Sequence, residues 1–244
     1  MYDDISEIRA FYAGRQGQQV AAQIGPRVSK FWSRSKGCCN VALGFATPFL
    51  QWDEADSVLM PKRQGVLIWP HNRPVRSVLV DTHALPVPDV QTDRLLLVHA
   101  LEFEADPSRM LDECWRILDG AGRLLVIVPN RHGIWTRAEK TPLGHGRPYS
   151  RRQLRQLLQH HGFEPREIKT MLFMPPMIVG WMPKLSNSME RLGARWLPGL
   201  GGVLIAEADK MLYAPAGKTS KLRQAGTSVR PRFASQTSRV SQWS

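Results

Sequence analysis

Cysteine is scarce in this sequence of 244 residues, where only Cys38, Cys39 and Cys114 are present. An odd number of cysteines, two of them adjacent, excludes the disulfide framework of a small secreted domain. No C-x-x-C pair or histidine-rich spacing accompanies them, so no metal site is expected. The three cysteines are better interpreted as reduced thiols of a cytoplasmic protein.

Long apolar runs are also missing. The longest apolar-leaning stretch, residues 171–183, is about 13 residues long and prolines interrupt it, which is too short to span a bilayer. The first residues, MYDDISEIRAFY, are acidic and contain no apolar segment typical of a signal peptide. We therefore expect neither a transmembrane segment nor a signal peptide.

Acidic residues are absent after Asp209, although the chain as a whole contains 21 of them against 33 Lys and Arg. Residues 215–244 carry six basic side chains and supply half of the net charge of +12. Ser, Thr, Gln, Gly and Pro fill most of this segment, which predicts a basic disordered tail. The tail could contact nucleic acid or an acidic membrane, or it could simply keep the protein soluble. Nucleic acid is the weaker interpretation, because no dedicated RNA-binding motif is present.

The rest of the composition, 43% hydrophobic and 22% charged, is that of a globular protein with one large domain or a small pair. Apolar residues at helical spacing predict a helical segment over residues 1–34, with a break near Pro26. An α/β domain is expected over residues 35–214, followed by the tail at 215–244.

A strand–helix–strand unit is the clearest pattern in that domain. Residues 94–98 and 123–129 are apolar runs typical of buried parallel strands, and Asp106-Pro107 opens a helix between them. Residues 119–122 are expected to form the turn that ends this helix. This βαβ unit predicts a parallel sheet. Further elements are expected as strands at 40–43, 57–60, 77–80, 163–173 and 201–214, and as helices at 151–161 and 177–197.

Ligands of open parallel sheets bind at the carboxyl ends of the strands, near the point where the strand order reverses. The residues that follow the expected strands are therefore the candidates. A glycine such as Gly44 lets a ligand approach the backbone, and a carboxylate such as Asp81 accepts hydrogen bonds from ribose or adenine. A single Gly and a single Asp are weak signals, and such a pair is more often part of ordinary turns than of a binding site. The candidate positions are Gly44-Phe45-Ala46, Met60-Pro61, Asp81-Thr82 and His99-Ala100.

Residues 81–130 resemble the core of class I S-adenosylmethionine-dependent methyltransferases, specifically the small-molecule type 11 group that includes quinone C-methylases. Residues 149–164 match the helix that these proteins place before their sixth strand, and the resemblance covers roughly residues 35–175. It implies a Rossmann-like, doubly wound, mostly parallel sheet and S-adenosylmethionine as cofactor. The matching positions are Asp93, His99-Ala100-Leu101-Glu102, Asp106-Pro107, Leu111, Glu113, Arg116-Ile117-Leu118 and Gly122-Arg123-Leu124.

The chain departs from this family at two places. The family's first motif is an acidic residue followed by G-x-G-x-G, whereas this chain keeps only Gly44, with Ala46 and Pro48 in the following positions. The acid that grips the ribose at the end of the second strand is replaced by Met60, whose side chain lacks the carboxylate oxygens. Losing one such bond weakens binding about tenfold or more.

The resemblance assigns the cofactor to Gly44, Phe45, Ala46, Met60, Asp81, Thr82 and His99. Asp81 would accept the adenine amino group, and the Thr82 N–H would face the ring. His99 is the candidate base. A buried histidine satisfied by a neighbour is the competing interpretation.

Three functions are compatible with these residues. The first is methyl transfer from S-adenosylmethionine to an unidentified small molecule, which the apolar stretch 171–183 would make lipophilic unless it belongs to the core. The second is a catalytically inactive scaffold that binds a partner protein, which the eroded first motif favours. The third is an RNA-modifying enzyme that uses the basic tail.

Overall fold

The computed structural model describes residues 4–32, 38–50, 57–177, 192–193, 195–197 and 199–212. Residues 1–212 belong to one compact unit. The tail expected at 215–244 and most of the helix expected at 177–197 lie outside the described residues. The proposed domain boundaries at 34/35 and 214/215 stay predictions.

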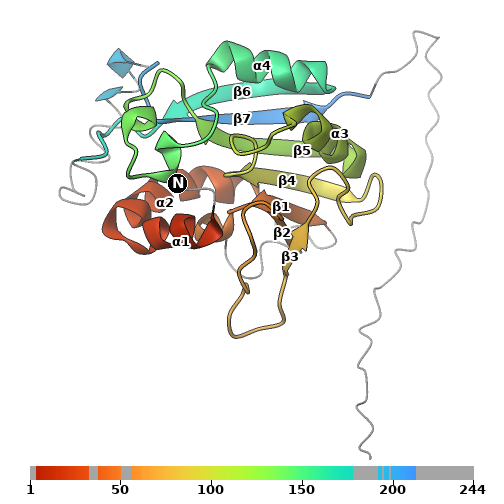
Figure 1. Ribbon diagram of the computed structural model, residues 1–244. Helices are drawn as coiled ribbons and strands as arrows, with labels where there is room; N and C mark the ends of the chain where they lie inside the picture. The colour runs from red at the N-terminus through yellow and green to blue at the C-terminus, as the bar shows by residue number, and fades with distance from the viewer. Residues whose placement is uncertain are drawn as a thin grey trace, which may run out of the picture. The chain divides into compact units, whose positions relative to one another are not determined.

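The core of the fold is a seven-stranded sheet in the order β3-β2-β1-β4-β5-β7-β6 (Figure 1). Every pairing is parallel except those of β7, which runs antiparallel to β5 and to β6. The order reverses between β1 and β4, so this boundary is the switch point of a doubly wound sheet. The expected fold class is therefore confirmed. The strands are β1 (Asn40–Gly44), β2 (Ser57–Pro61), β3 (Ser77–Val80), β4 (Thr92–Val98), β5 (Leu118–Pro129), β6 (Phe163–Met171) and β7 (Val203–Lys210).

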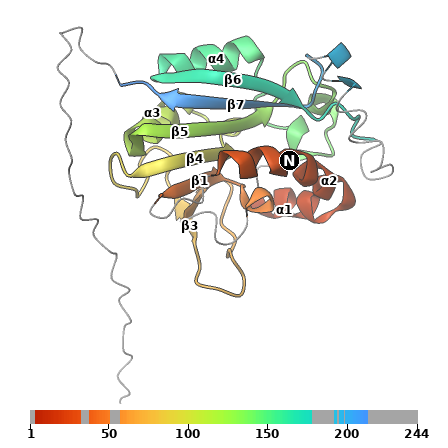
Figure 2. The same cartoon turned by 180° about the vertical axis from the view of Figure 1, so that it is seen from behind.

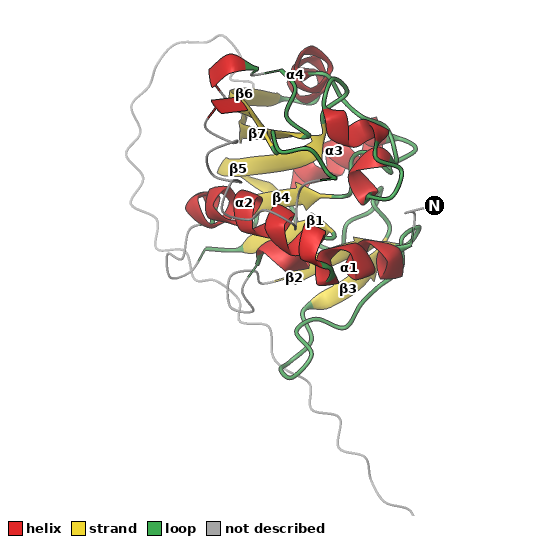
Figure 3. Cartoon of the chain, turned by 90° about the vertical axis from the view of Figure 1, so that its left-hand side faces the viewer, coloured by secondary structure: helices red, strands yellow, loops and turns green. Residues whose placement is uncertain are grey.

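Helices cover both faces of the sheet (Figure 3). The helices α1 (Ile5–Ala13) and α2 (Arg15–Phe31) pack on one face, and α3 (Pro107–Ile117) and α4 (Arg151–His160) pack on the other. Figure 2 shows α1 and α2 together beside the central strands. Three short 3₁₀ helices, η1 (Thr47–Phe49), η2 (Ile134–Arg137) and η3 (Pro142–Gly144), complete the described elements.

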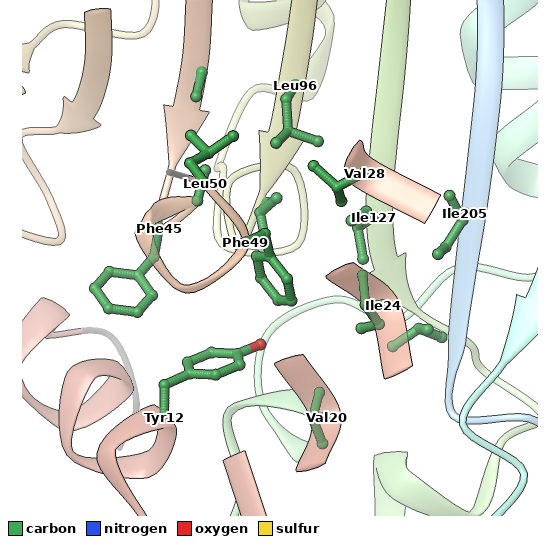
Figure 4. Packing of buried hydrophobic residues seen from close by; sticks show 14 of the residues in the cluster. Tyr12, Val20, Ile24, Val28, Phe45, Phe49, Leu50, Leu96, Ile127 and Ile205 are labelled. Carbon is green, nitrogen blue, oxygen red and sulfur yellow. The ribbon is translucent and has the colours of Figure 1, made fainter. Parts of the chain in front are cut away.

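The alternation of side chains along each central strand divides the core into two layers. In β4, Leu96 and Val98 face the α1/α2 layer, while Leu95 and Leu97 face the α3/α4 layer. All of these residues are buried, as expected for a parallel sheet covered on both faces. Figure 4 shows the first layer, where α2 residues pack against β4, β5 and β7.

The break in the N-terminal helical segment lies at Gly14 and not near Pro26, so that expectation was wrong. Gly14 has an extended backbone and separates α1 from α2, whereas Pro26 lies inside α2. A proline inside a helix removes one backbone hydrogen bond and also clashes with the Cβ of the preceding residue, but here that residue is Gly25, which has no Cβ. The buried face that Val20, Ile24 and Val28 form on the sheet holds the helix through this point.

The turn expected at residues 119–122 was also wrong, because β5 begins at Leu118, directly after α3. The β4–β5 register still shifts here, with Thr92 opposite Leu118 but Arg94 opposite Arg123. The glycines therefore produce an irregularity within the strand where a separate turn was expected.

Candidate functional site

Gly44 ends β1 at the switch point, and its backbone conformation suits glycine alone. Its φ is +89°, and a Cβ at this position would lie 2.1 Å from the carbonyl oxygen of Val98. Two conditions thus coincide here, a left-handed backbone and a close approach between β1 and β4. The surviving glycine of the first motif fixes the path of the chain out of the sheet.

Phe45 and Ala46 follow with buried side chains. The Phe45 N–H donates to the Val98 oxygen at 2.8 Å, and the Ala46 N–H donates to the Gly44 oxygen at 3.1 Å. Both amides therefore bond within the chain. The resemblance assigned both residues to the cofactor, but in this structure their side chains are buried and their N–H groups are already bonded, so neither group is available to it.

Met60 lies in β2, and its side chain is fully buried. Its sulfur accepts a hydrogen bond from the Leu67 N–H at 3.2 Å. Met60 therefore packs in the α1/α2 layer and presents no oxygen to a ribose.

Asp81 directly follows β3, and its carboxylate is half exposed. Oδ1 accepts the His83 N–H at 3.0 Å, and Lys62 lies 3.9 Å from Oδ2. Thr82 is buried and donates its hydroxyl hydrogen to Glu104 at 2.6 Å. Asp81 is thus an accessible acceptor at the carboxyl edge of the sheet, with a backbone that its own side chain fixes.

His99 follows β4 with a φ of +51°, which is unusual for a residue other than glycine. The imidazole is 2% exposed. Nε2 lies 2.8 Å from the Tyr12 hydroxyl, and Nδ1 lies 3.0 Å from Oε1 of Glu102. The His99 carbonyl accepts a hydrogen bond from Nε2 of Gln64 at 2.7 Å. His99 is therefore a buried histidine with partners on both ring nitrogens.

Tyr12, Gln64 and Glu102 were not among the site residues expected from the sequence. Tyr12 counted only as part of the apolar face of a helix, and its signal was the hydroxyl on that buried face. Glu102 was visible three residues after His99, within a motif of the resemblance. Gln64 gave no signal, because its contact with His99 joins two loops far apart in the sequence.

Two phenylalanine rings lie close to the Tyr12 ring (Figure 4). The Tyr12 ring lies 5.8 Å from Phe45 and 5.5 Å from Phe49, measured between ring centres. Burial raises the pKa of Tyr12 well above its usual range, and the charge of Glu102 raises it further. Tyr12 is therefore a neutral hydrogen-bond donor at neutral pH.

The residues at this edge fit S-adenosylmethionine at two of three points. Gly44 gives the close backbone approach, and Asp81 gives an accessible carboxylate for an adenine amino group. The described part of β2 offers no acid for the ribose, since Met60 is buried. Within the described ranges, no cluster of His, Cys, Asp or Glu could hold a metal ion, and no helix is long and apolar enough to cross a membrane.

Comparisons with known proteins show what this chain resembles in sequence and in fold. Residues 60–126 match the family model of a methyltransferase domain. A probable S-adenosylmethionine-dependent methyltransferase of Mycolicibacterium smegmatis is 34% identical over 82 residues, which are 33% of this chain and 32% of that protein. The match thus spans about a third of the relative's length.

Solved structures share the fold over most of this chain. A possible histamine N-methyltransferase of Thermotoga maritima aligns over 84% of this chain and 96% of its own, with a TM-score of 0.61 and 19% identity. Geranyl diphosphate methyltransferase in complex with S-adenosylmethionine aligns over 80% of this chain and 90% of its own, with a TM-score of 0.55 and 12% identity. The resemblance to class I S-adenosylmethionine-dependent methyltransferases is therefore confirmed in sequence over residues 60–126 and in fold over most of the described chain.

Proposed function

We propose that this chain, which has the class I methyltransferase fold, is an S-adenosylmethionine-dependent methyltransferase. The observation that carries the proposal is that Gly44 and Asp81 lie at the same edge of the sheet. Gly44 ends β1 and Asp81 directly follows β3, and because these strands are parallel, both residues lie at the carboxyl edge, where this fold binds its ligands. The matched family segment, residues 60–126, includes Asp81.

The cofactor, when bound, supplies a methyl group on a positively charged sulfur. Asp81 would accept the adenine amino group, and Gly44 would let the ligand approach the β1 backbone. Thr82 would lie at the same edge, whereas the side chains of Phe45 and Ala46 are buried in the α1/α2 layer and would not face the ligand. The chain's own task is to position donor and acceptor, which by itself lowers a barrier by several kcal/mol.

We propose a small molecule as the methyl acceptor. A lipophilic acceptor was expected from the apolar stretch 171–183, but Leu172 and Met174 in its described part are buried in the α1/α2 layer. Core packing accounts for those two residues. No contact among the described residues therefore supports a lipophilic acceptor.

Calorimetric titration with S-adenosylmethionine tests the proposal. We expect micromolar binding by the wild-type chain and a loss of about tenfold or more in Asp81→Asn, which removes the charged acceptor. Asp119→Asn is the matched control, because Asp119 also accepts the N–H two residues ahead, from Ala121 at 2.9 Å, but lies near the amino end of β5.

Two results would contradict the proposal. The first is the absence of binding at millimolar cofactor, which would favour the inactive scaffold. The second is an equal loss of affinity in both variants, because Asp81 would then have no particular role.

A further inference from the structure

Three buried side chains form a continuous hydrogen-bonded chain at the carboxyl end of β4. Tyr12 comes from α1, His99 follows β4, and Glu102 lies in the turn after it. Their residues are 8%, 2% and 3% exposed. Their contacts are the two given above, from the hydroxyl to Nε2 and from Nδ1 to the carboxylate. We call them the Tyr12–His99–Glu102 chain.

The positions of the protons follow from the partners. Within the described residues, the Tyr12 hydroxyl has no hydrogen-bond partner other than Nε2 of His99. A buried hydroxyl donates its hydrogen where it can, so Nε2 is the acceptor and carries no proton. The neutral imidazole then has its hydrogen on Nδ1, which donates to Oε1 of Glu102.

Several features around the Tyr12–His99–Glu102 chain lower the stability of the fold, and packing alone does not require them. The positive φ of His99 strains its backbone, and such strain clusters at functional sites. Glu102 Oε2 and Gln64 Oε1 are buried with no hydrogen-bond partner among the described residues. Each buried polar atom without a partner lowers the stability of the fold. A purely structural cluster would gain stability from apolar side chains at these positions.

We propose that Tyr12 and Glu102 are positioning residues for His99, which hold its imidazole with the proton on Nδ1 and keep the Nε2 lone pair for the proton of a methyl acceptor. The inference rests on the proposed methyltransferase function. It makes α1 part of the active site. It also assigns the acceptor to the class that donates a hydrogen bond, a hydroxyl or an amine.

This arrangement gives the proton of the methyl acceptor a place to go, which is Nε2 of His99. Because His99 is buried, an acceptor reaches Nε2 only after Tyr12 has moved aside, and its O–H or N–H replaces the phenol as donor. The acceptor's oxygen or nitrogen takes the methyl group, the electron pair of the broken carbon–sulfur bond stays on sulfur, and the acceptor's proton passes to Nε2. The resulting imidazolium keeps its Nδ1–H on Glu102, whose negative charge stabilises it.

Nitrogen NMR of the full-length chain labelled with [¹⁵N]histidine tests the tautomer directly. His99→Gln assigns the His99 signals. We expect the wild-type chain at neutral pH to show Nδ1 protonated and Nε2 unprotonated. Tyr12→Phe should shift Nε2 to the frequency of a lone pair that accepts no hydrogen bond. Tyr149→Phe is the matched control, because that buried phenol donates to the Leu101 carbonyl and should leave His99 unchanged.

A second variant keeps the test decisive if Tyr12→Phe fails to fold. Glu102→Met removes the acceptor at similar length, so the proton should move from Nδ1 to Nε2. A wild-type His99 protonated on Nε2, or a His99 spectrum that neither variant changes, would overturn the inference.

Titration of the same samples with S-adenosylmethionine separates this inference from the proposed function. If the wild type binds the cofactor but His99 carries its proton on Nε2, only the positioning role fails. If His99 shows the expected tautomer but no cofactor binds, the proposed function fails and the base role fails with it.

Discussion

Gly44 shows what a single residue contributes to this site. It is the one glycine that survives from the family's three-glycine pattern, and the structure explains why this one cannot be replaced. Its left-handed backbone and its approach to Val98 both exclude a side chain. Ala46 occupies the next glycine position with a buried side chain in an ordinary helical conformation, so an alanine is tolerated there.

Gly44→Ala should therefore lower the free energy of unfolding by about 2 kcal/mol or more, since it adds both a strained φ and a backbone clash. Gly199→Ala is the control, because a Cβ at the exposed Gly199 meets nothing within 4 Å. That change should alter the free energy of unfolding by less than about 0.5 kcal/mol. Urea unfolding of the two variants measures both effects, and equal stabilities would contradict this account of Gly44.

The element that holds the Asp81 segment in place is α3. Arg116 donates to both oxygens of Glu113 and to the carbonyls of Leu85 and Val87, and Glu113 accepts the Leu85 N–H at 2.8 Å. One helix face thus clamps the loop that follows β3. The hydrogen bond from Arg116 lowers the pKa of Glu113, outweighing the burial that raises it.

A lowered carboxyl pKa predicts how stability depends on pH. The folded chain binds the Glu113 proton more weakly than the unfolded chain does, so the contribution is complete above the unfolded pKa of about 4.3 and disappears as pH falls through the lower folded value. Glu113→Gln should cost about 1 kcal/mol at pH 7 and progressively less below about pH 4. Unfolding curves of both proteins from pH 3 to 7 measure this.

Glu164→Gln removes an exposed surface carboxylate and serves as the control for that series. Its stability should follow the wild type across the range. If the free energy of unfolding of Glu113→Gln stays below that of the wild type by a constant amount down to pH 3, the charge of Glu113 is not the source of the stabilisation.

Other elements show which features the sequence could predict and which it could not. Helix caps and apolar periodicity depend only on residues close together in the sequence. The starts of α3 and α4 were therefore predictable from Asp106 and Ser150, which are the N-caps of these helices. The break at Gly14 depended on how closely α1 and α2 cross, since a Cβ at Gly17 would lie 2.2 Å from the Phe11 oxygen. Such an approach between two helices has no signature in periodicity.

The same distinction holds for the site. The positions after each strand were predictable because parallel strands end at one edge of the sheet. The partners of His99 were not, because Tyr12 and Gln64 reach it from residues 87 and 35 positions away. Contacts between loops at such separation are decided by the assembled fold.

At the scale of the whole molecule, the assigned site residues all lie between Tyr12 and Glu102, within the compact unit of residues 1–212. Half of the net charge of +12, in contrast, comes from residues 215–244. We therefore expect a chain that lacks residues 215–244 to bind S-adenosylmethionine with a dissociation constant within about twofold of the full chain, because no residue assigned to the cofactor belongs to that segment. Calorimetry of the two chains checks this, and a tenfold loss would assign part of the cofactor site to the tail.

The measurement that tests the central claim most directly is a map of amide hydrogen exchange in the full chain with and without S-adenosylmethionine. The account predicts that the cofactor slows exchange in peptides covering residues 40–50 and 78–85, at the carboxyl ends of β1 and β3. Peptides near the amino end of β5 should be unaffected. Cofactor that leaves both edge segments unchanged, or that protects only the opposite edge, would contradict the placement of the site at Gly44 and Asp81.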